Sequence, residues 1–272
     1  SAGDVVGFDG ACYSAAEVAL FEKTFWKNGI VMNSQIDLLE VLWSDRPSLP
    51  TSKAFLHPVK WAGKTRPEKF TQIYSEIEKI GGTATIISAL DDLCWTFNIR
   101  GADVECNPVV LGYGIIQKEK SMLFVDIDKF DKQAIDELTA DGVEILSYGD
   151  FYDYLTTVEN EVVVIDPNRT NYLIQQKIVE KNRLIEAVSV PNLLKSVKNN
   201  AEILGMRKAM VEDGLALLDF QFWLENTIGK EQITEYDVVC KLEERRSKRP
   251  GFKGISFESI VGYKDHGAIV HL

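Results

Sequence analysis

The most informative stretch of this 272-residue chain is residues 88–108, which read SALDDLCWTFNIRGADVECNP. It follows the apolar, β-branched run at 84–87, which is typical of a buried strand. Ser88 is followed three residues later by Asp91, and this is the spacing of a helix N-cap whose side chain and backbone exchange hydrogen bonds. The stretch therefore predicts a strand that leads directly into a capped helix.

The helix has one apolar side, because its large apolar residues recur at intervals of three to four. These residues are Leu90, Leu93 and Phe97. The following segment, 98–103, is polar and contains a glycine, so it predicts a loop. Pro108 then forces an extended backbone on the residue before it and on the exit into the next apolar run.

The same alternation of strand-like and helix-like segments continues along the middle of the chain. The expected strands are 84–87, 109–117, 121–126, 143–146, 162–165 and 184–188. The expected helices between and before them are 65–80, 89–97, 132–139, 151–157 and 171–181. Helices alternating with strands predict an α/β fold. The short polar turn at 118–120 predicts a hairpin, so the sheet of about six strands should be mixed.

The two ends of the chain differ from this middle part. Residues 1–45 predict only one helix and two short strands, which is too little to enclose a core. Three prolines between residues 46 and 58 indicate a linker. After Pro191 the pattern changes to a long helix that begins at Asn199 and a second helix that begins at Thr234. We expect Met206 and Met210 of the long helix to lie in a core.

Composition excludes several classes of partner and location. The net charge of −11 opposes binding to nucleic acid and to anionic membrane surfaces. No apolar run is long enough for a membrane span, and no signal peptide is visible at the N-terminus. The four cysteines contain no C-x-x-C pair, so we expect reduced thiols in the cytoplasm. A nucleophilic Cys94 paired with His57 remains an alternative, although no spacing supports it.

Residues 88–108 resemble a segment in the second N-terminal domain of the long, three-domain Xaa-Pro aminopeptidases, which are creatinase/prolidase-like metallopeptidases. The resemblance extends over essentially the whole chain. The other matching strings lie at 7–14, 37–47, 195–209, 233–235, 256–260 and 267–271. The resemblance implies that the chain is a central piece of a longer enzyme.

The resemblance also implies a domain organisation. Residues 1–45 would be the end of a first creatinase-like α/β domain, and residues 46–190 would be a second creatinase N-terminal-like domain with the mixed sheet. Residues 191–272 would be the start of an α+β pita-bread metallopeptidase domain.

The implied activity is hydrolysis of peptides that carry proline in second position, by a hydroxide held between two metal ions, usually manganese. The family's ligands are two Asp, one His and two Glu, and they follow the string at 267–271, so we expect no metal site in this chain. The only histidines are His57, His266 and His271, and no H-E-x-x-H motif exists. The longer enzyme is expected to be a homodimer.

Two residues are candidates for the functional site. By resemblance, His271 lies beside the metal pair and binds substrate or stabilises the tetrahedral intermediate; a terminal histidine without a role is the alternative in this chain. Arg100 lies in the loop after the predicted helix, where it could reach substrate. A structural salt bridge from Arg100 to Asp103 or Asp92 is the alternative.

Two other functions stay open. The chain could be a non-catalytic creatinase-like module for dimerisation or substrate gating. It could also be an unrelated cysteine hydrolase that uses Cys94.

Overall fold

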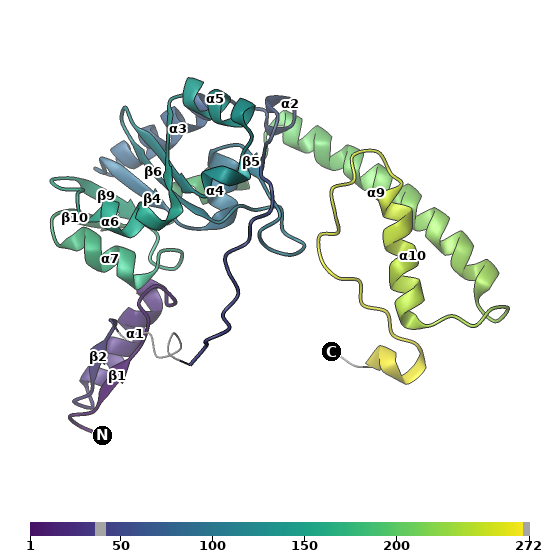
Figure 1. Cartoon of the computed structure of the whole chain (residues 1–272), viewed down its shortest axis with the longest axis horizontal. Coiled ribbons are helices and arrows are strands. Elements are labelled where there is room, and N and C mark those ends of the chain that lie inside the picture. The colour runs from purple at the N-terminus through teal and green to yellow at the C-terminus, as the bar shows by residue number, and fades with distance from the viewer. Residues whose placement is uncertain (36–41, 269–272) are drawn as a thin grey trace. The chain divides into compact units, whose positions relative to one another are not determined.

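The computed structural model describes residues 1–35 and 42–268 (Figure 1). They form two compact units. The first unit comprises Ser1–Asp103 and Val109–Val197, and the second comprises Val104–Pro108 and the chain from Lys198 onward.

A six-stranded mixed sheet forms the centre of the first unit (Figure 1). In spatial order its strands are β10 (Arg183–Glu186), β9 (Val162–Ile165), β4 (Ala84–Ile87), β6 (Gly112–Gln117), β7 (Ser121–Val125) and β8 (Val143–Ser147). The predicted hairpin joins β6 to β7 in an antiparallel pair. The α/β class and the mixed sheet of about six strands are confirmed.

Strand direction brings the loops of this sheet to one edge. β6 is antiparallel to both β4 and β7, so β4 and β7 run the same way. β9 and β10 are parallel to β4, and β8 is parallel to β7. The carboxyl ends of five strands and the amino end of β6 therefore meet at one edge, which we call the carboxyl edge.

Helices cover both faces of the sheet. One face carries α3 (Arg66–Lys79), α4 (Leu90–Thr96), α5 (Lys132–Ala140) and α8 (Val190–Ser196). The other face carries α6 (Phe151–Leu155) and α7 (Tyr172–Val179). Successive strand residues point to opposite faces, so Ile116 and Leu123 join the first core while Ile115 and Met122 join the second. Each face of the sheet thus has its own apolar core.

α3 shows why its sequence forms a helix and where the prediction fails. Thr65 and Glu68 form a capping box at its start. Ile73 and Ile77 are fully buried, as the apolar spacing predicts. Ile80 is instead 46% exposed, because the helix ends at Lys79 and Ile80 no longer follows its periodicity.

The predicted capping of α4 is wrong. The N-cap residue is Ala89, and no side chain caps the helix. The hydroxyl of Ser88 donates to the carbonyl of Arg169 instead, at 2.7 Å. Asp91 is held by Lys195 and Arg169, so its carboxylate does not return a bond to the cap. Contacts with distant parts of the chain have replaced the local motif.

The predicted loop at 98–103 contains a short strand. β5 (Ile99–Arg100) pairs antiparallel with β3 (Phe55–Leu56). Asn98 precedes it with a φ of 49°, a left-handed conformation that asparagine tolerates better than most residues. The chain can therefore turn sharply from α4 into β5. The segment after β3 forms α2 (Val59–Ala62).

The N-terminal segment forms a small parallel β-α-β unit. It consists of β1 (Val5–Gly7), α1 (Ala15–Trp26) and β2 (Val31–Asn33). The predicted capping box of Ser14 and Glu17 starts α1. α1 packs against α7, and the amide of Ala15 donates to the carbonyl of Thr170 at 2.9 Å. The segment is thus attached to the face of the sheet that carries α6 and α7.

The region around Pro191 is not an open linker, because α8 is a helix whose first two residues are buried in the first unit. The second unit contains α9 (Asn200–Thr227) and α10 (Glu235–Ser247), which pack together. Met206 and Met210 are 60% and 59% exposed, so their expected place in a core is wrong for the residues described. None of the described helices meets the length and apolarity that crossing a membrane requires.

The described part of the matching string at 267–271 lies in a 3₁₀ helix, η3 (Lys264–Ala268). Residues 269–272 lie outside the described residues, as do positions 36–41 of the matching string at 37–47.

Gly112 marks a close approach between β6 and β7. A Cβ atom at this position would lie 2.7 Å from the carbonyl oxygen of Phe124 and 2.7 Å from Cγ1 of Val125. We expect Gly112→Ala to lower the free energy of unfolding by about 1–3 kcal/mol, because the strands cannot separate without losing hydrogen bonds. Urea unfolding should show a lower midpoint with an unchanged m-value.

Gly149→Ala is the matched control, because a Cβ there meets only Oγ of Ser147 at 3.8 Å. Equal midpoints for the two variants would contradict the close approach.

Candidate functional site

The carboxyl edge gathers the buried charged side chains that could carry chemistry. Open α/β sheets bind ligands at this kind of edge. Two groups of charges lie there. One surrounds Asp92 at the start of α4, and the other joins Asp103 to Lys129.

We call the first group the Asp92 cluster; it consists of Asp91, Asp92, Arg169 and Lys195. The side chain of Asp92 is 1% exposed. Its Oδ1 accepts a hydrogen bond from Nζ of Lys195 at 2.7 Å. Its Oδ2 accepts from the guanidinium of Arg169 at 3.0 Å and from the hydroxyl of Ser189 at 2.8 Å. Both oxygens of this buried carboxylate are thus bound, as burial of a charge requires.

Asp91 shares the same two cations. It accepts from Arg169 at 3.2 Å and also from Lys195. Burial raises the pKa of Asp91, but Lys195 and Arg169 outweigh it, so the pKa lies below its ordinary value. A general acid needs a proton near neutral pH. Asp91 is therefore unsuited to act as a general acid, and the Asp92 cluster is suited to fastening α8 against α4.

Asp103 and Lys129 form a buried ion pair. Their side chains are 1% and 3% exposed, and Nζ of Lys129 lies 2.5 Å from Oδ2 of Asp103. The carboxylate also accepts from the amide of Leu111 and the hydroxyl of Ser52, each at 2.7 Å. Burial raises the pKa of Asp103, yet these three donors together lower it below its ordinary value. The pair closes the base of the loop at residues 104–108.

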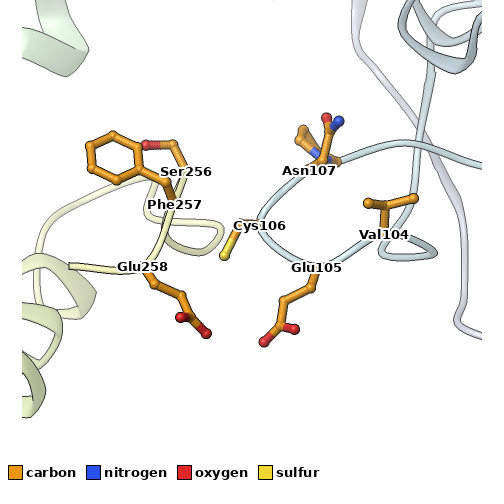
Figure 2. Close-up of a pocket in the computed structure, with 8 residues that line it drawn as sticks. Val104, Glu105, Cys106, Asn107, Ser256, Phe257 and Glu258 are labelled. Atoms are coloured by element: carbon orange, nitrogen blue, oxygen red, sulfur yellow. The ribbon is translucent and has the colours of Figure 1, made fainter. Parts of the chain in front are cut away.

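That loop belongs to the second unit, where it faces residues 256–258 across a hollow of about 680 Å³ (Figure 2). Figure 2 shows the Cys106 thiol between the side chains of Glu105 and Glu258. Burial and the two carboxylates raise the pKa of Cys106 above its ordinary value. A raised pKa leaves little thiolate, so the hollow holds no activated nucleophile.

Lys69 is a buried lysine on α3, only 1% exposed. Its Nζ donates to the carbonyl of Trp95 at 2.6 Å and to Oδ1 of Asn98 at 2.7 Å. It also lies 4.1 Å from the centroid of the Trp95 ring, within reach of a cation–π interaction. Lys69 thus stabilises the C-terminal end of α4 and the left-handed turn at Asn98.

Arg100 follows that turn on β5. One guanidinium nitrogen donates to the carbonyls of Cys94 and Ile99, both at 2.8 Å. The sequence analysis gave a salt bridge from Arg100 to Asp103 or Asp92 as the alternative. In the structure, other cations bind both of these carboxylates. Asp103 is bound by Lys129, and Asp92 is bound by Arg169 and Lys195. Arg100 therefore supports the end of α4, and a role in substrate binding stays a prediction.

His57 belongs to the first unit and His266 to the second. The amide of His57 donates to the carbonyl of Asn98 in the first unit. His266 is 59% exposed in the second unit, and its Nδ1 lies 3.0 Å from Oε1 of Glu235. His271 lies outside the described residues. Among residues 1–35 and 42–268, no group of three or more His, Cys, Asp or Glu side chains could hold a metal ion. The residues present therefore do not fit a dinuclear metal centre.

Cys94 is unsuited to nucleophilic attack. It is 2% exposed, and its sulfur accepts a hydrogen bond from the amide of Val110 at 3.2 Å. Burial raises the pKa of Cys94 to about 11. The thiol is thus protonated at neutral pH and is inaccessible to a substrate, which disfavours the cysteine hydrolase hypothesis.

The sequence analysis missed several buried cations. Lys69 lies four residues before Ile73 and eight before Ile77, so it occupies the buried stripe of α3. Arg66, three residues earlier, is 3% exposed and binds Glu137 and Asp141 of the α5 region. A cation at an apolar position of the helical period was the available signal. Lys129 and Lys195 had no comparable signal.

Comparisons with known proteins place this fold in a family. A model of the Creatinase/Prolidase N-terminal domain matches residues 45–202. A probable Xaa-Pro aminopeptidase P from Aspergillus fumigatus is 33% identical over 283 residues, which covers 99% of this chain and 43% of that protein. A protein of the same description from Paracoccidioides lutzii is 32% identical and is covered to 46%.

A solved structure is similar along most of the chain. It is the X-prolyl aminopeptidase from Caenorhabditis elegans, described as a cytosolic enzyme with a di-nuclear active site. The TM-score is 0.87 at 26% identity, over 94% of this chain and 43% of that protein. The chain therefore spans less than half the length of the relatives it matches.

The Asp103–Lys129 pair predicts a specific dependence on pH. We expect Asp103→Asn to cost about 3–5 kcal/mol at pH 7, because it leaves the buried Lys129 ammonium without its counter-charge. The lowered pKa of Asp103 means that its stabilisation is complete above the unfolded pKa of about 3.9 and is lost as pH falls through the folded pKa. The difference in the free energy of unfolding between wild type and variant should therefore become smaller below about pH 4, as measured by urea unfolding.

Asp136→Asn is the control, because Asp136 pairs with Lys132 on an exposed helix surface. Its effect should stay within about 0.5 kcal/mol at every pH. A gap for Asp103→Asn that stays constant from pH 7 to pH 3 would contradict the assigned pKa direction.

Proposed function

Since this chain belongs to the Creatinase/Prolidase N-terminal domain family, we propose that it is part of a metal-dependent Xaa-Pro aminopeptidase. Such an enzyme hydrolyses the bond between an N-terminal residue and a following proline. The proposal is carried by one observation, which is similarity along nearly the whole chain to proteins of that description. Its substrates would be peptides with proline in second position.

Apart from His271, which lies outside the described residues, the chain would supply a non-catalytic part of this enzyme. Its described residues do not fit a metal centre, so no step of the hydrolysis is assigned to them. The Asp92 cluster and the Asp103–Lys129 pair hold loops in place at the carboxyl edge, which suits a module that positions or gates substrate. A module for dimerisation is the second candidate, and the longer enzyme would be a homodimer.

The finer features of the family remain part of this proposal. Residues 1–45 would end a first creatinase-like domain, residues 46–190 would form a second, and residues 191–272 would start a pita-bread domain. The two metal ions of the longer enzyme would be manganese, and the enzyme would be cytoplasmic.

The proposal predicts a difference between this chain and a form extended to the full length of its relatives. After identical dialysis, the 272-residue chain should retain no stoichiometric manganese or zinc and should not cleave an Xaa-Pro peptide. The extended form should retain about two metal ions per chain and should cleave the peptide. Elemental analysis and a cleavage assay on both proteins measure this. Metal retention and turnover by the short chain would refute the division of roles.

Two residues are proposed to act on substrate in the extended form. Arg100→Gln should raise KM about tenfold with little change in kcat, because it removes a charge that binds the peptide. His271→Ala should lower kcat by about a hundredfold, because it removes a donor that stabilises the tetrahedral intermediate.

Arg183→Gln is the control for Arg100, because Arg183 is exposed on the edge strand β10. Thermal unfolding of the Arg100→Gln variant distinguishes a role of Arg100 in substrate binding from a role in supporting α4. A lowered Tm for Arg100→Gln with an unchanged KM would assign Arg100 a structural role only.

A further inference from the structure

A carboxylate at the start of α10 holds the last described turn of the second unit. Oε1 of Glu235 accepts a hydrogen bond from the backbone amide of Tyr263 at 2.6 Å. The same oxygen lies 3.0 Å from Nδ1 of His266, and Oε2 lies 3.1 Å from it. We call these contacts the Glu235 clamp, and all three residues belong to the second unit. The clamp ties η3 and the residue before it to the first turn of α10.

The turn at 262–267 is compact by itself. The amide of His266 donates to the carbonyl of Tyr263 at 3.1 Å. Gly262 lies so close to Gly267 that a Cβ atom on Gly262 would be 2.8 Å from Cα of Gly267. The turn can therefore dock on α10, or leave it, as one piece.

Apolar contacts hold this part of the chain only weakly. Phe257, Ile260 and Tyr263 are 70%, 77% and 64% exposed. Segments with few buried apolar contacts open at a low cost in free energy. The docking of the turn therefore depends on polar contacts, and the Glu235 clamp supplies two of them.

The imidazole of His266 faces an acidic surrounding. The clamp lies beside a hollow of about 660 Å³ in the second unit, whose lining includes the carboxylates of Glu231, Glu235 and Asp265. Among the described residues that line this hollow, His266 is the only basic side chain. Lys264, on η3 itself, lies over an aromatic ring at 5.2 Å from its centroid. Protonation of His266 therefore places a positive charge among three carboxylates, which favours the docked turn.

The clamp gains its charge on the acidic side of neutral pH. The hydrogen bond from the Tyr263 amide and the contact with His266 lower the pKa of Glu235 below its ordinary value, so Glu235 is ionised at pH 5.5. A histidine changes its charge between about pH 5 and pH 8. Both ring nitrogens donate in the protonated form, whereas the neutral ring donates from only one of them. The charge-assisted contact is thus present at low pH and is lost as the imidazole is deprotonated.

We propose that the Glu235 clamp is a pH-dependent device, which holds the turn at 262–267 on α10 when His266 is protonated and releases it more readily when His266 is neutral. This goes beyond the peptidase function proposed above, because it requires neither a metal ion nor a peptide. It makes the firmness with which the end of the described chain is held dependent on pH near neutrality.

The test is exchange of backbone amides with solvent, measured by NMR on the isotope-labelled 272-residue chain at pH 5.5 and pH 8. The protection factor is the intrinsic exchange rate divided by the measured rate, so the pH dependence of intrinsic exchange cancels. The protection factor of the Tyr263 amide should fall about fivefold from pH 5.5 to pH 8, because an exposed ion pair has a modest effect. The amide of Val238, which donates to the carbonyl of Thr234 in α10, should keep its protection.

His266→Gln should remove this dependence, because glutamine is neutral at both pH values. The Tyr263 amide of that variant should have the same protection factor at pH 5.5 and at pH 8. His57→Gln is the matched control, since it replaces a histidine of the first unit in the same way. It should retain the fall of about fivefold at Tyr263.

Three outcomes would overturn the proposal. The first is a wild-type chain whose Tyr263 protection factor is the same at both pH values. The second is a fall that persists in the His266→Gln variant. The third is an equal fall at Val238, which would assign the change to opening of the whole second unit. None of these outcomes would bear on Xaa-Pro cleavage by the extended form.

Discussion

The ammonium group of Lys69 must be satisfied without water, and the arrangement around the end of α4 depends on how this is done. An uncompensated buried charge costs several kcal/mol, so its partners cannot move away independently. One partner is the carbonyl of Trp95 at the end of α4, and another is Asn98 at the turn that follows. The amide nitrogen of Asn98 in turn donates to the carbonyl of Lys64. α3, α4 and the segment before α3 are thus fixed through a single cation.

The requirement that a buried charge be satisfied also applies to the carboxylates of the carboxyl edge. Their position is typical of an active site, but each carboxylate is already bound by a cation. Asp92 and Asp103 are buried carboxylates in loops at the ends of strands, where catalytic groups often lie. Each is bound by a cation and by a hydroxyl, so both oxygens of each carboxylate already accept hydrogen bonds. The ion pairs and hydrogen bonds of Asp92 and Asp103 hold these loops together. The evidence for peptidase function therefore rests on relatedness along the chain.

Local patterns predicted most of the fold and little of the site. The apolar runs predicted all six strands of the sheet, because short β-branched runs are typical of buried strands. The capping boxes at Ser14, Thr65 and Thr234 are local motifs, because each is completed within four residues. Ser88 had a similar local spacing, but its partner proved to be Arg169, 81 residues away. No local pattern contains that information.

The site was harder to predict for the same reason. Lys195 meets Asp92 across 103 residues, and Lys129 meets Asp103 across 26. Spacing along the sequence cannot reveal such pairs. Arg100 was singled out by its place in the loop after the predicted helix, and its hydrogen bonds to two carbonyls were not foreseeable from its neighbours.

The strand order also has a consequence for synthesis on the ribosome. β6 and β7 are joined by a short turn, so they can pair as soon as both have emerged. β4 then has one edge filled by β6, while its other edge awaits β9, as Thr85 and Val164 are 79 residues apart. Until β9 has been made, an apolar strand buried on both faces in the finished protein exposes an unpaired edge. Such edges invite pairing with other chains, so β4 is open to aggregation until residues 162–165 have been made.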